Sequence, residues 1–313
     1  MIRLAIIGPG RISHRFLRGT DHIENIKVST FASRHPENVR EYAEAEHIDV
    51  IETYEELYND NNADAVYVST PTFTHYEIIK KCLNAGKHVL SEKPLTLHSC
   101  EARELYDLAK SKGLTLMEAE KGLYLPVYDQ IKAWLDDGVL GTIHAAEASY
   151  CRSGMPLTEE TMNHLPKGGI VFDIGVYPLT ELYALFPSHI DSFAYTREML
   201  HGQIASATMI QCTADNILLT AKCSVSYTDD NSLVIYGDRG KIVCSNYWKG
   251  HDCTLYVNGK EPVCSHYDFD SEFAFQIRHF LNLVETGQCI SDRNTDLLSC
   301  DVISTCERIT EGH

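Results

Sequence analysis

The chain has 313 residues, 44% of them hydrophobic and 23% charged, and this length favours two domains over a single core. The formal net charge of −17 argues against nucleic acid or an anionic membrane as the main partner, because both need a basic surface. The eleven cysteines are irregularly spaced, which argues against a secreted disulfide framework, so we expect free thiols in a cytoplasmic protein. The 15 histidines are scattered, which argues against a metal centre, so we expect no metal.

Residues 1 to about 120 alternate short apolar runs with helix-like segments. The runs that predict strands are Leu4 to Ile7, Ile26 to Ala32, Ala65 to Val68, Val89 to Leu90 and Leu114 to Met117. The segments that predict helices are Glu37 to Ala45, Tyr76 to Ala85 and Cys100 to Ser111. Strands that alternate with helices imply parallel pairing and right-handed crossovers. We therefore expect an α/β fold whose first domain, residues 1–120, is a doubly wound parallel sheet.

Residues 121–313 have a different pattern, in which one apolar helix precedes a run of strands. The predicted helix is Ile170 to Phe186, and two more span about Ser271 to Thr286 and Leu297 to Ile309. The predicted strands are Ala205 to Thr213, Ile217 to Tyr227, Ser232 to Tyr236, Lys241 to Ser245 and Cys253 to Val257, with a hairpin turn at Asp238-Arg239-Gly240. Alternation along Leu219 to Tyr227 predicts a mostly antiparallel sheet with one open face, in a domain for substrate binding and dimerisation.

A glycine-containing turn follows the first predicted strand, with the sequence Gly8-Pro9-Gly10-Arg11-Ile12-Ser13. Two glycines let the backbone pass close to a pyrophosphate whose charge sits at the N-terminus of the next helix. Ser13 stands where the fingerprint has a third glycine or alanine, so the motif alone also fits an ordinary turn. Its place at the start of the alternating half favours a nucleotide site that includes Gly8, Gly10, Arg11 and Ile12.

Polar residues also follow the second and third predicted strands of this half. Ser33-Arg34 has no acidic side chain for a ribose 2′-hydroxyl, and an arginine accommodates a 2′-phosphate, so we expect NADP, with NAD as the alternative. An exposed arginine at a helix start is the other interpretation. Thr70-Pro71 and His75 predict either a loop along the cofactor's ribose and nicotinamide or an ordinary helix N-cap.

Three further residues carry candidate chemistry. Lys93, in Ser91-Glu92-Lys93-Pro94, follows a strand, and the carboxyl ends of parallel strands are where open α/β sheets bind ligands. Asp173 and Tyr177 lie four residues apart in the apolar helix and would share one of its faces. A carboxylate and a phenol in so apolar a segment need partners, so a merely structural hydrogen-bonded pair is the alternative to a catalytic one.

These motifs together resemble the glucose–fructose oxidoreductase/inositol dehydrogenase/MocA (Gfo/Idh/MocA) family, in its dihydrodiol-dehydrogenase-like or sugar-dehydrogenase-like branch. The resemblance extends over essentially the whole chain. The matching elements, in order, are Gly8-Pro9-Gly10, Asp64-Ala65-Val66-Tyr67 leading into Thr70-Pro71, His75, Glu92-Lys93-Pro94, Met117-Glu118-Ala119, Gly168-Gly169, Asp173-x-Gly175-x-Tyr177 and Gly237-x-x-Gly240. Glu-Lys-Pro combined with Asp-x-Gly-x-Tyr is the most specific part. Residues 162–167 form a shorter segment than the family's usual loop at that place.

The resemblance implies an N-terminal Rossmann domain and a C-terminal α/β domain with an open-faced sheet. It places the family's catalytic lysine on Lys93, its aspartate on Asp173 and its acid/base on Tyr177. It also places Glu92 beside the cofactor and implies a peptide bond before Pro94 that is often cis.

The expected activity is NAD(P)-dependent hydride transfer to or from a secondary alcohol or carbonyl of a sugar, cyclitol or dihydrodiol. Tyr177 would exchange the hydroxyl proton, the Lys93 ammonium would polarise the carbonyl, and Asp173 would orient either group. The partners expected are a small polyhydroxylated substrate and further copies of the chain, in a homodimer or larger homo-oligomer. Two alternatives remain: a cofactor-assisted glycosidase, and a non-enzymatic NAD(P)-binding sensor on the same fold.

Overall fold

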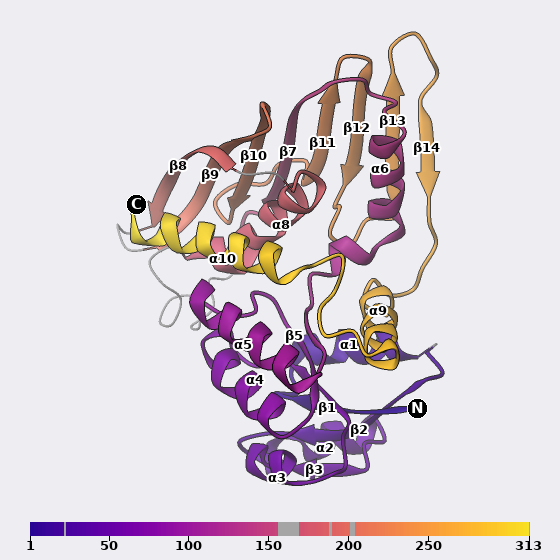
Figure 1. The fold of residues 1–313 in the computed structure, drawn as a ribbon, viewed down its shortest axis with the longest axis vertical. Coiled ribbons are helices and arrows are strands. Elements are labelled where there is room, and N and C mark those ends of the chain that lie inside the picture. The colour runs from indigo at the N-terminus through magenta and orange to yellow at the C-terminus, as the bar shows by residue number, and fades with distance from the viewer. Residues whose placement is uncertain (22, 156–168, 188–189, 201–203, 313) are drawn as a thin grey trace. The chain divides into compact units, whose positions relative to one another are not determined.

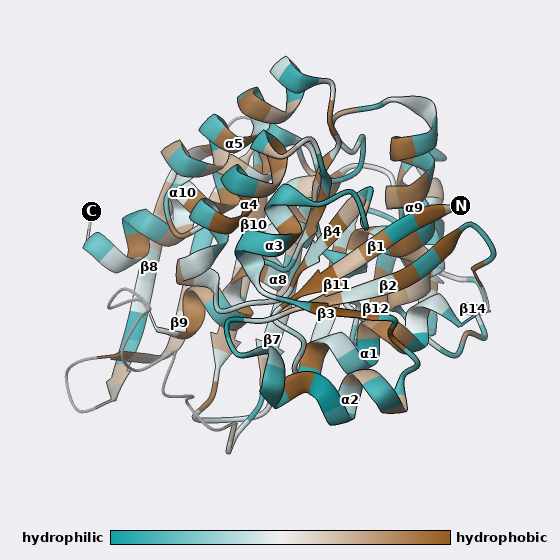
Figure 2. Ribbon diagram, turned by 90° about the horizontal axis from the view of Figure 1, so that it is seen from below, coloured by the Kyte–Doolittle hydropathy of each residue, from teal (hydrophilic) through white to brown (hydrophobic). Residues whose placement is uncertain are grey.

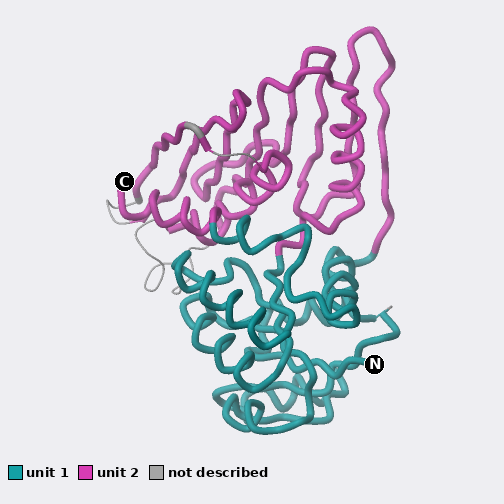
Figure 3. The backbone as a smooth tube through the Cα atoms, in the orientation of Figure 1, with its two compact units in different colours: residues 1–119, 270–300 teal, residues 120–269, 301–313 magenta. Residues whose placement is uncertain are grey.

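The computed structural model describes residues 1–21, 23–155, 169–187, 190–200 and 204–312. The chain forms two compact units, shown in different colours in Figure 3. The first comprises residues 1–119 and 270–300, and the second comprises residues 120–269 and 301–313. The sequence places residues 270–300 with the second domain, whereas the structure includes them in the first unit. No helix within the described residues is long and apolar enough to cross a membrane.

The first unit contains the parallel sheet that the sequence predicts, and Figure 1 shows its strands between helices. Its strand order is β3-β2-β1-β4-β5-β6, and all pairs are parallel. The strands are β1 (Ile2–Ile7), β2 (Ile26–Ala32), β3 (Val50–Glu52), β4 (Ala65–Val68), β5 (His88–Ser91) and β6 (Leu116–Glu118). The order reverses between β1 and β4, the switch point at which such sheets bind ligands.

The helices of this unit are amphipathic, and in Figure 2 several of them carry hydrophilic and hydrophobic residues side by side. They are α1 (Arg11–Thr20), η1 (Pro36–Val39), α2 (Arg40–Ala45), α3 (Tyr54–Asn59), η2 (Thr72–Thr74), α4 (His75–Asn84), α5 (Ser99–Lys112) and α9 (Phe273–Thr286). Helix α4 ends at Asn84, two residues before Gly86, and α5 ends at Lys112, immediately before Gly113; both glycines have a positive φ, as is common after helix ends.

Helix α9 belongs to the first unit because its apolar side packs closely on α1. A Cβ atom on Gly19 would lie only 2.7 Å from the Cβ atom of Phe273, so the small residue lets the helices approach. The Phe16 ring meets the Phe273 ring edge to face with centroids 6.4 Å apart, and Arg15 forms an ion pair with Glu272. Local sequence pattern cannot show that a helix more than 250 residues away completes this unit.

The second unit is built on an eight-stranded sheet in the order β14-β13-β12-β11-β7-β10-β9-β8. Its strands are β7 (Ile143–Cys151), β8 (Ile190–Leu200), β9 (Ile204–Ala214), β10 (Ile217–Ser224), β11 (Ser232–Gly237), β12 (Gly240–Ser245), β13 (Asp252–Val257) and β14 (Val263–His266). Every pair is antiparallel except β7 with β10, which is parallel. The predicted mostly antiparallel sheet is therefore confirmed, with β11 and β12 joined at Asp238-Arg239.

Helices cover one face of this sheet (Figure 1). They are η3 (Lys121–Tyr124), α6 (Pro126–Asp136), the π-helical turn η4 (Val171–Gly175), α8 (Val176–Leu185) and α10 (Asp296–Glu311), of which residues 301–311 belong to this unit. Strand β10 ends at Ser224 instead of the predicted Tyr227, because the Ser224 hydroxyl accepts hydrogen bonds from the N–H groups of Ser226 (3.0 Å) and Tyr227 (3.2 Å) and turns the chain.

Candidate active site

The predicted cofactor residues all lie in the first unit, just beyond the carboxyl ends of its parallel strands. These ends meet at one edge of the sheet. Gly8, Gly10, Arg11 and Ile12 follow β1, Ser33 and Arg34 follow β2, Thr70, Pro71 and His75 follow β4, and Glu92 and Lys93 follow β5. The predicted catalytic residues are divided, since Lys93 is in the first unit and Asp173 and Tyr177 are in the second.

The Gly8 backbone lies against the loop after β4. Gly8 has a φ of 77°, and a Cβ atom added there would lie 2.6 Å from Cγ2 of Thr70. The Ser69 hydroxyl donates to the carbonyl of Gly8 over 3.1 Å, which joins the two loops. At Gly10 an added Cβ would meet only the Gly8 carbonyl oxygen, at 3.8 Å, so the space outside this residue is open. The turn thus combines a tight backbone with free space at the helix N-terminus.

Ser13, at the third position of the fingerprint, closes this turn. Its hydroxyl accepts a hydrogen bond from the N–H of Gly10 (2.8 Å) and donates to the carbonyl of the same residue (2.6 Å). The Ser13 side chain is fully buried. The departure from the family pattern therefore replaces a close-packing glycine with a side chain that stabilises the start of α1.

The turn after β2 presents Arg34 to solvent. The N–H of Ser33 donates to the Glu52 carbonyl (3.0 Å), and the Ser33 hydroxyl accepts from the N–H of His35 (3.1 Å). The exposed Arg34 guanidinium lies beside the phenol of Tyr54, the first residue of α3. Burial raises the pKa of Tyr54, and the arginine offsets part of that rise.

His75 links the loops that follow β4 and β5. Its ring is 1% exposed, and its nitrogens face the carbonyl oxygens of Pro94 (Nδ1, 3.0 Å) and Thr70 (Nε2, 2.8 Å). Burial lowers the pKa of His75, which favours the neutral ring that donates one of these bonds. The geometry gives His75 the role of holding Thr70 and Pro94 in place, so it shapes the two loops without presenting its ring at the surface.

Glu92, Lys93 and Pro94 form the loop at the end of β5. The Tyr67 hydroxyl donates to Oε1 of Glu92 over 2.6 Å, and the buried Tyr67 ring stacks on Phe16 with centroids 3.7 Å apart. The peptide bond between Lys93 and Pro94 is cis, as the resemblance implies. Because His75 also faces the Pro94 carbonyl, this loop is held on both sides of Lys93.

In the second unit, Asp173 and Tyr177 lie in a helix that begins with a π-helical turn. Residues Val171–Gly175 form this wider turn, and α8 continues from Val176. The prediction of one regular helix is wrong at this point, and single π-helical turns are frequent at functional sites. Gly168 and residues 162–167 lie outside the described residues. Gly175 allows the close packing, because an added Cβ would lie 3.1 Å from Sγ of Cys223 on β10.

Three residues that the sequence analysis does not single out surround the Tyr177 ring. The Nζ atom of Lys121 lies 5.2 Å from the ring centre, and the Tyr150 and Trp248 rings have centroids at 5.5 and 6.2 Å. Lys121 is only 6% exposed, so its charge acts on the aromatic face with little screening. In the sequence, these residues could have been noticed only because Lys121 closely follows the Met117-Glu118-Ala119 motif and because Trp248 is one of two tryptophans.

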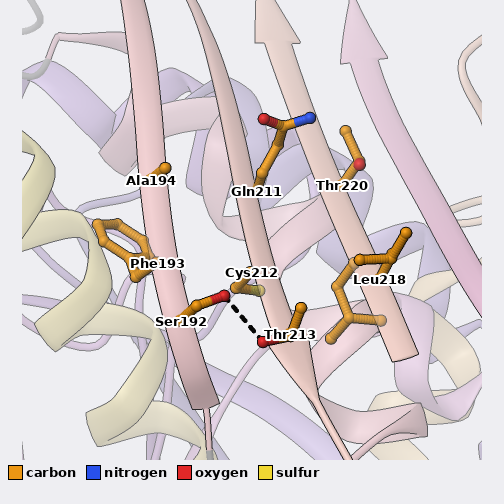
Figure 4. Close-up of a pocket in the computed structure, with 9 residues that line it drawn as sticks. Ser192, Phe193, Ala194, Gln211, Cys212, Thr213, Leu218 and Thr220 are labelled. Atoms are coloured by element: carbon orange, nitrogen blue, oxygen red, sulfur yellow. Dashed lines mark hydrogen bonds between the residues drawn. The ribbon is translucent and has the colours of Figure 1, made fainter. Parts of the chain in front are cut away.

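A separate hollow of about 300 Å³ lies on the open face of the second sheet, lined by β8, β9 and β10. Figure 4 shows Ser192, Gln211, Leu218 and Thr220 around it, and the Ser192 and Thr213 hydroxyls 2.8 Å apart. It contains none of the predicted site residues.

Two families of domain match the chain. The family described as "Oxidoreductase family, NAD-binding Rossmann fold" matches residues 2–120, and the "GFO/IDH/MocA C-terminal domain" matches residues 128–243. These two ranges lie in the parts with the parallel and the mostly antiparallel sheet.

Relatives with named activities cover nearly the whole chain. The scyllo-inositol 2-dehydrogenase (NADP(+)) IolU of Bacillus subtilis is 30% identical over 309 residues, which are 94% of this chain and 92% of that protein. The trans-1,2-dihydrobenzene-1,2-diol dehydrogenase of Xenopus tropicalis is 27% identical over 266 residues, covering 82% of this chain and 78% of that enzyme.

A solved structure has the same fold. KijD10, a 3-ketoreductase from Actinomadura kijaniata in complex with TDP-benzene and NADP, superposes with a TM-score of 0.85 at 25% identity, over 98% of this chain and 96% of that one. With both domains matched and a 30% identical relative along 94% of its length, the chain belongs to the Gfo/Idh/MocA family of oxidoreductases with an NAD-binding Rossmann domain.

Proposed function

We propose that this protein is an NADP-dependent dehydrogenase or reductase that acts on a secondary alcohol or its carbonyl in a sugar, a cyclitol or a dihydrodiol. The observation that carries the proposal is the common edge of the first sheet, where the Gly8 turn, Arg34 and Lys93 all follow strand ends. The named substrates of the relatives, scyllo-inositol, a dihydrobenzene diol and a keto sugar, support this class of compound.

The residues present fit a dinucleotide. The positive φ of Gly8 and the open space outside Gly10 leave room for a pyrophosphate at the N-terminus of α1. Arg34 would bind a 2′-phosphate, while Thr70 and Pro71 would line the ribose and Glu92 the nicotinamide side. When bound, NADP would supply or accept a hydride at the substrate carbon.

The chain's own residues handle the proton and the charge. Tyr177 would give or take the hydroxyl proton of the substrate, and the ammonium of Lys93 would polarise the substrate oxygen. Asp173, one helical turn before Tyr177, would orient the substrate hydroxyl or the lysine. The buried ammonium of Lys121 supports the charge of a tyrosinate because it lies over the Tyr177 ring.

A substrate screen tests the proposal. Inositols, aldoses, nucleotide-linked keto sugars and dihydrodiols are incubated with NADP and NADPH, and separately with NAD and NADH, while nicotinamide absorbance is followed. We expect turnover with at least one polyhydroxylated substrate and a preference for the phosphorylated cofactor. Release of sugar from a glycoside without net nicotinamide change would instead identify a cofactor-assisted glycosidase. Tight NADPH binding without turnover of any compound would favour a sensor.

We also propose a cytoplasmic homodimer. All eleven cysteines are free thiols, which suits a reducing compartment. The strand register places Leu218, Tyr236 and Tyr256 in one row across the open face of the second sheet. They are 60%, 38% and 40% exposed, with Ala145 between the first two and Lys241 between the second two, so this face carries exposed apolar side chains that a partner would cover. A second copy, related by a two-fold axis, would cover this row.

A further inference from the structure

Glu118 is a buried carboxylate at the end of β6, beside the loop that carries Lys93. Strand register pairs Glu118 with Ser91, two residues before Lys93. The Glu118 side chain is 4% exposed. Three groups donate hydrogen bonds to it: the N–H of Leu95 to Oε1 (2.7 Å), and the Ser299 hydroxyl (2.6 Å) and the Asn294 amide (3.2 Å) to Oε2.

These donors come from two parts of the first unit that are far apart in the sequence. Leu95 lies two residues after Lys93, whereas Asn294 and Ser299 belong to the segment 270–300 that returns to this unit. The carboxylate thus links the lysine loop to the start of α10, because one of its oxygens accepts from the lysine loop and the other accepts from the segment 270–300. A shift of Glu118 would move the backbone on which Lys93 is placed.

The surroundings of Glu118 also act on its charge. A buried carboxylate is costly unless it is paired or hydrogen bonded. Burial raises the pKa of Glu118, while the donors on Ser299, Leu95 and Asn294 and the nearby Lys93 ammonium act in the opposite direction. Glu118 pairs with Ser91 and accepts from the N–H of Leu95, so its contacts bracket Lys93 within two residues on either side and place opposite charges in the same part of the unit.

We infer that Glu118 is a positioning residue for Lys93, which fixes the backbone after the lysine and supplies the counter-charge of its ammonium. This inference rests on the proposed role of Lys93 in the reaction. No substrate or cofactor contact is assigned to Glu118. It acts on the chemistry only through the place and charge of Lys93.

The direct test measures the charge of Lys93 without any substrate. Trace labelling with an amine-reactive anhydride across a pH series, read by peptide mass spectrometry, gives the midpoint at which Lys93 loses its proton. In Glu118→Gln the amide keeps an oxygen for the Leu95 N–H but carries no charge. We expect the Lys93 midpoint to fall by about one pH unit, because the favourable charge is gone. Other titratable side chains that belong to this loop or contact it are Glu92, Tyr67 and His75.

The matched control is Ser299→Ala, which removes the hydroxyl donor to Oε2 of Glu118 and leaves the charge. Its Lys93 midpoint should equal that of the wild-type protein. If Glu118→Gln does not fold, Glu118→Asp replaces it. This variant keeps the charge but moves it back by one methylene group, so the Lys93 midpoint should fall by less than the change of about one pH unit expected for Glu118→Gln. An unchanged midpoint in the folded Glu118 variant overturns the inference, even if the melting temperature falls.

Turnover separates this inference from the proposed function. With an active substrate, Glu118→Gln should lower kcat about 10- to 100-fold with NADPH affinity retained, since a misplaced catalytic group costs this much. Ser299→Ala should lose less than about 3-fold, because the charge of Glu118 and its bond from the Leu95 N–H both remain. If Lys93→Met is as active as wild type, the proposed function fails. If Lys93→Met is inactive while Glu118→Gln has wild-type kcat and labelling, only the role of Glu118 is wrong.

Discussion

The Ser13 hydroxyl bonds both to the N–H and to the carbonyl of Gly10, at 2.8 and 2.6 Å. The residue that breaks the glycine pattern of the nucleotide turn is therefore the one that stabilises the helix behind it. A fingerprint with two glycines and a serine retains the tight turn at Gly8 and gains a capping interaction at the start of α1.

Replacing Ser13 with alanine should lower the free energy of unfolding by about 1 kcal/mol, the typical worth of a capping hydroxyl. Urea denaturation of wild type and Ser13→Ala measures the difference. Ser111→Ala is the control, because Ser111 is an exposed serine whose hydroxyl donates to a helix carbonyl (Leu108, 2.8 Å) at the other end of its helix. An equal loss in the free energy of unfolding in the two variants would show that the contact with Gly10 stabilises the protein no more than an exposed serine does.

Arg34 should determine cofactor preference. Arg34→Ala should weaken NADPH binding about 10-fold or more and change NADH binding less than about 3-fold, since only the phosphorylated cofactor loses a charge-assisted contact. Calorimetric titration of both cofactors measures this. Arg40→Ala, which removes an exposed arginine at the start of α2, is the control for general electrostatics. Parallel losses for NADPH and NADH would place Arg34 away from the 2′-phosphate.

Glu181 should make stability fall as the pH rises. Burial raises the pKa of Glu181, on α8, to about 8, so the folded protein holds a proton that the unfolded chain releases above its ordinary pKa near 4.5. The stability from this group is fully present below pH 4.5 and is lost as pH rises through 8. Glu181→Gln mimics the protonated form, so its melting temperature should rise relative to wild type between pH 5 and 9. Melting curves that stay parallel would contradict the buried, protonated state of this carboxyl.

Leu218 should control association. Leu218→Glu places a charge at the most exposed position of this row on the second sheet, where a covering copy would have to bury it. Light scattering should give twice the chain mass for wild type and about 35 kDa for the variant. Lys260→Glu, in the turn after β13, is the control for the added negative charge. A wild-type mass of 35 kDa at micromolar concentration would remove the dimer.

The sequence predicts the first unit well because its strands are short, mostly apolar and separated by amphipathic helices. The run Ile26 to Ala32, for example, is the whole of β2. Strand β7 was not predicted, although it lies inside the second sheet between β11 and β10. Its sequence, with Ala145, Ala146, Glu147 and Ala148, lacks the β-branched alternation that indicates a strand.

Residues whose role depends on distant contacts are the ones that local pattern misses. Glu118 was recognised only as part of a motif, because its partner Ser299 lies 181 residues later. Lys121 looked like any surface lysine, and only the fold buries it over the Tyr177 ring. The candidate residues Gly8, Lys93 and Tyr177 could be named because they belong to short motifs whose chemistry is visible in sequence.

The central claim is that Tyr177 carries the proton of an NADP-dependent reaction at a secondary alcohol. The most direct measurement is kcat of folded Tyr177→Phe with the substrate found by screening, together with its melting temperature and its NADPH affinity. Loss of a general acid–base group predicts a fall of about 10²–10⁴-fold in kcat. The melting temperature should stay close to that of wild type, and NADPH affinity should be unchanged. A Tyr177→Phe protein with lowered melting temperature and wild-type kcat would contradict the claim and make the phenol a structural group.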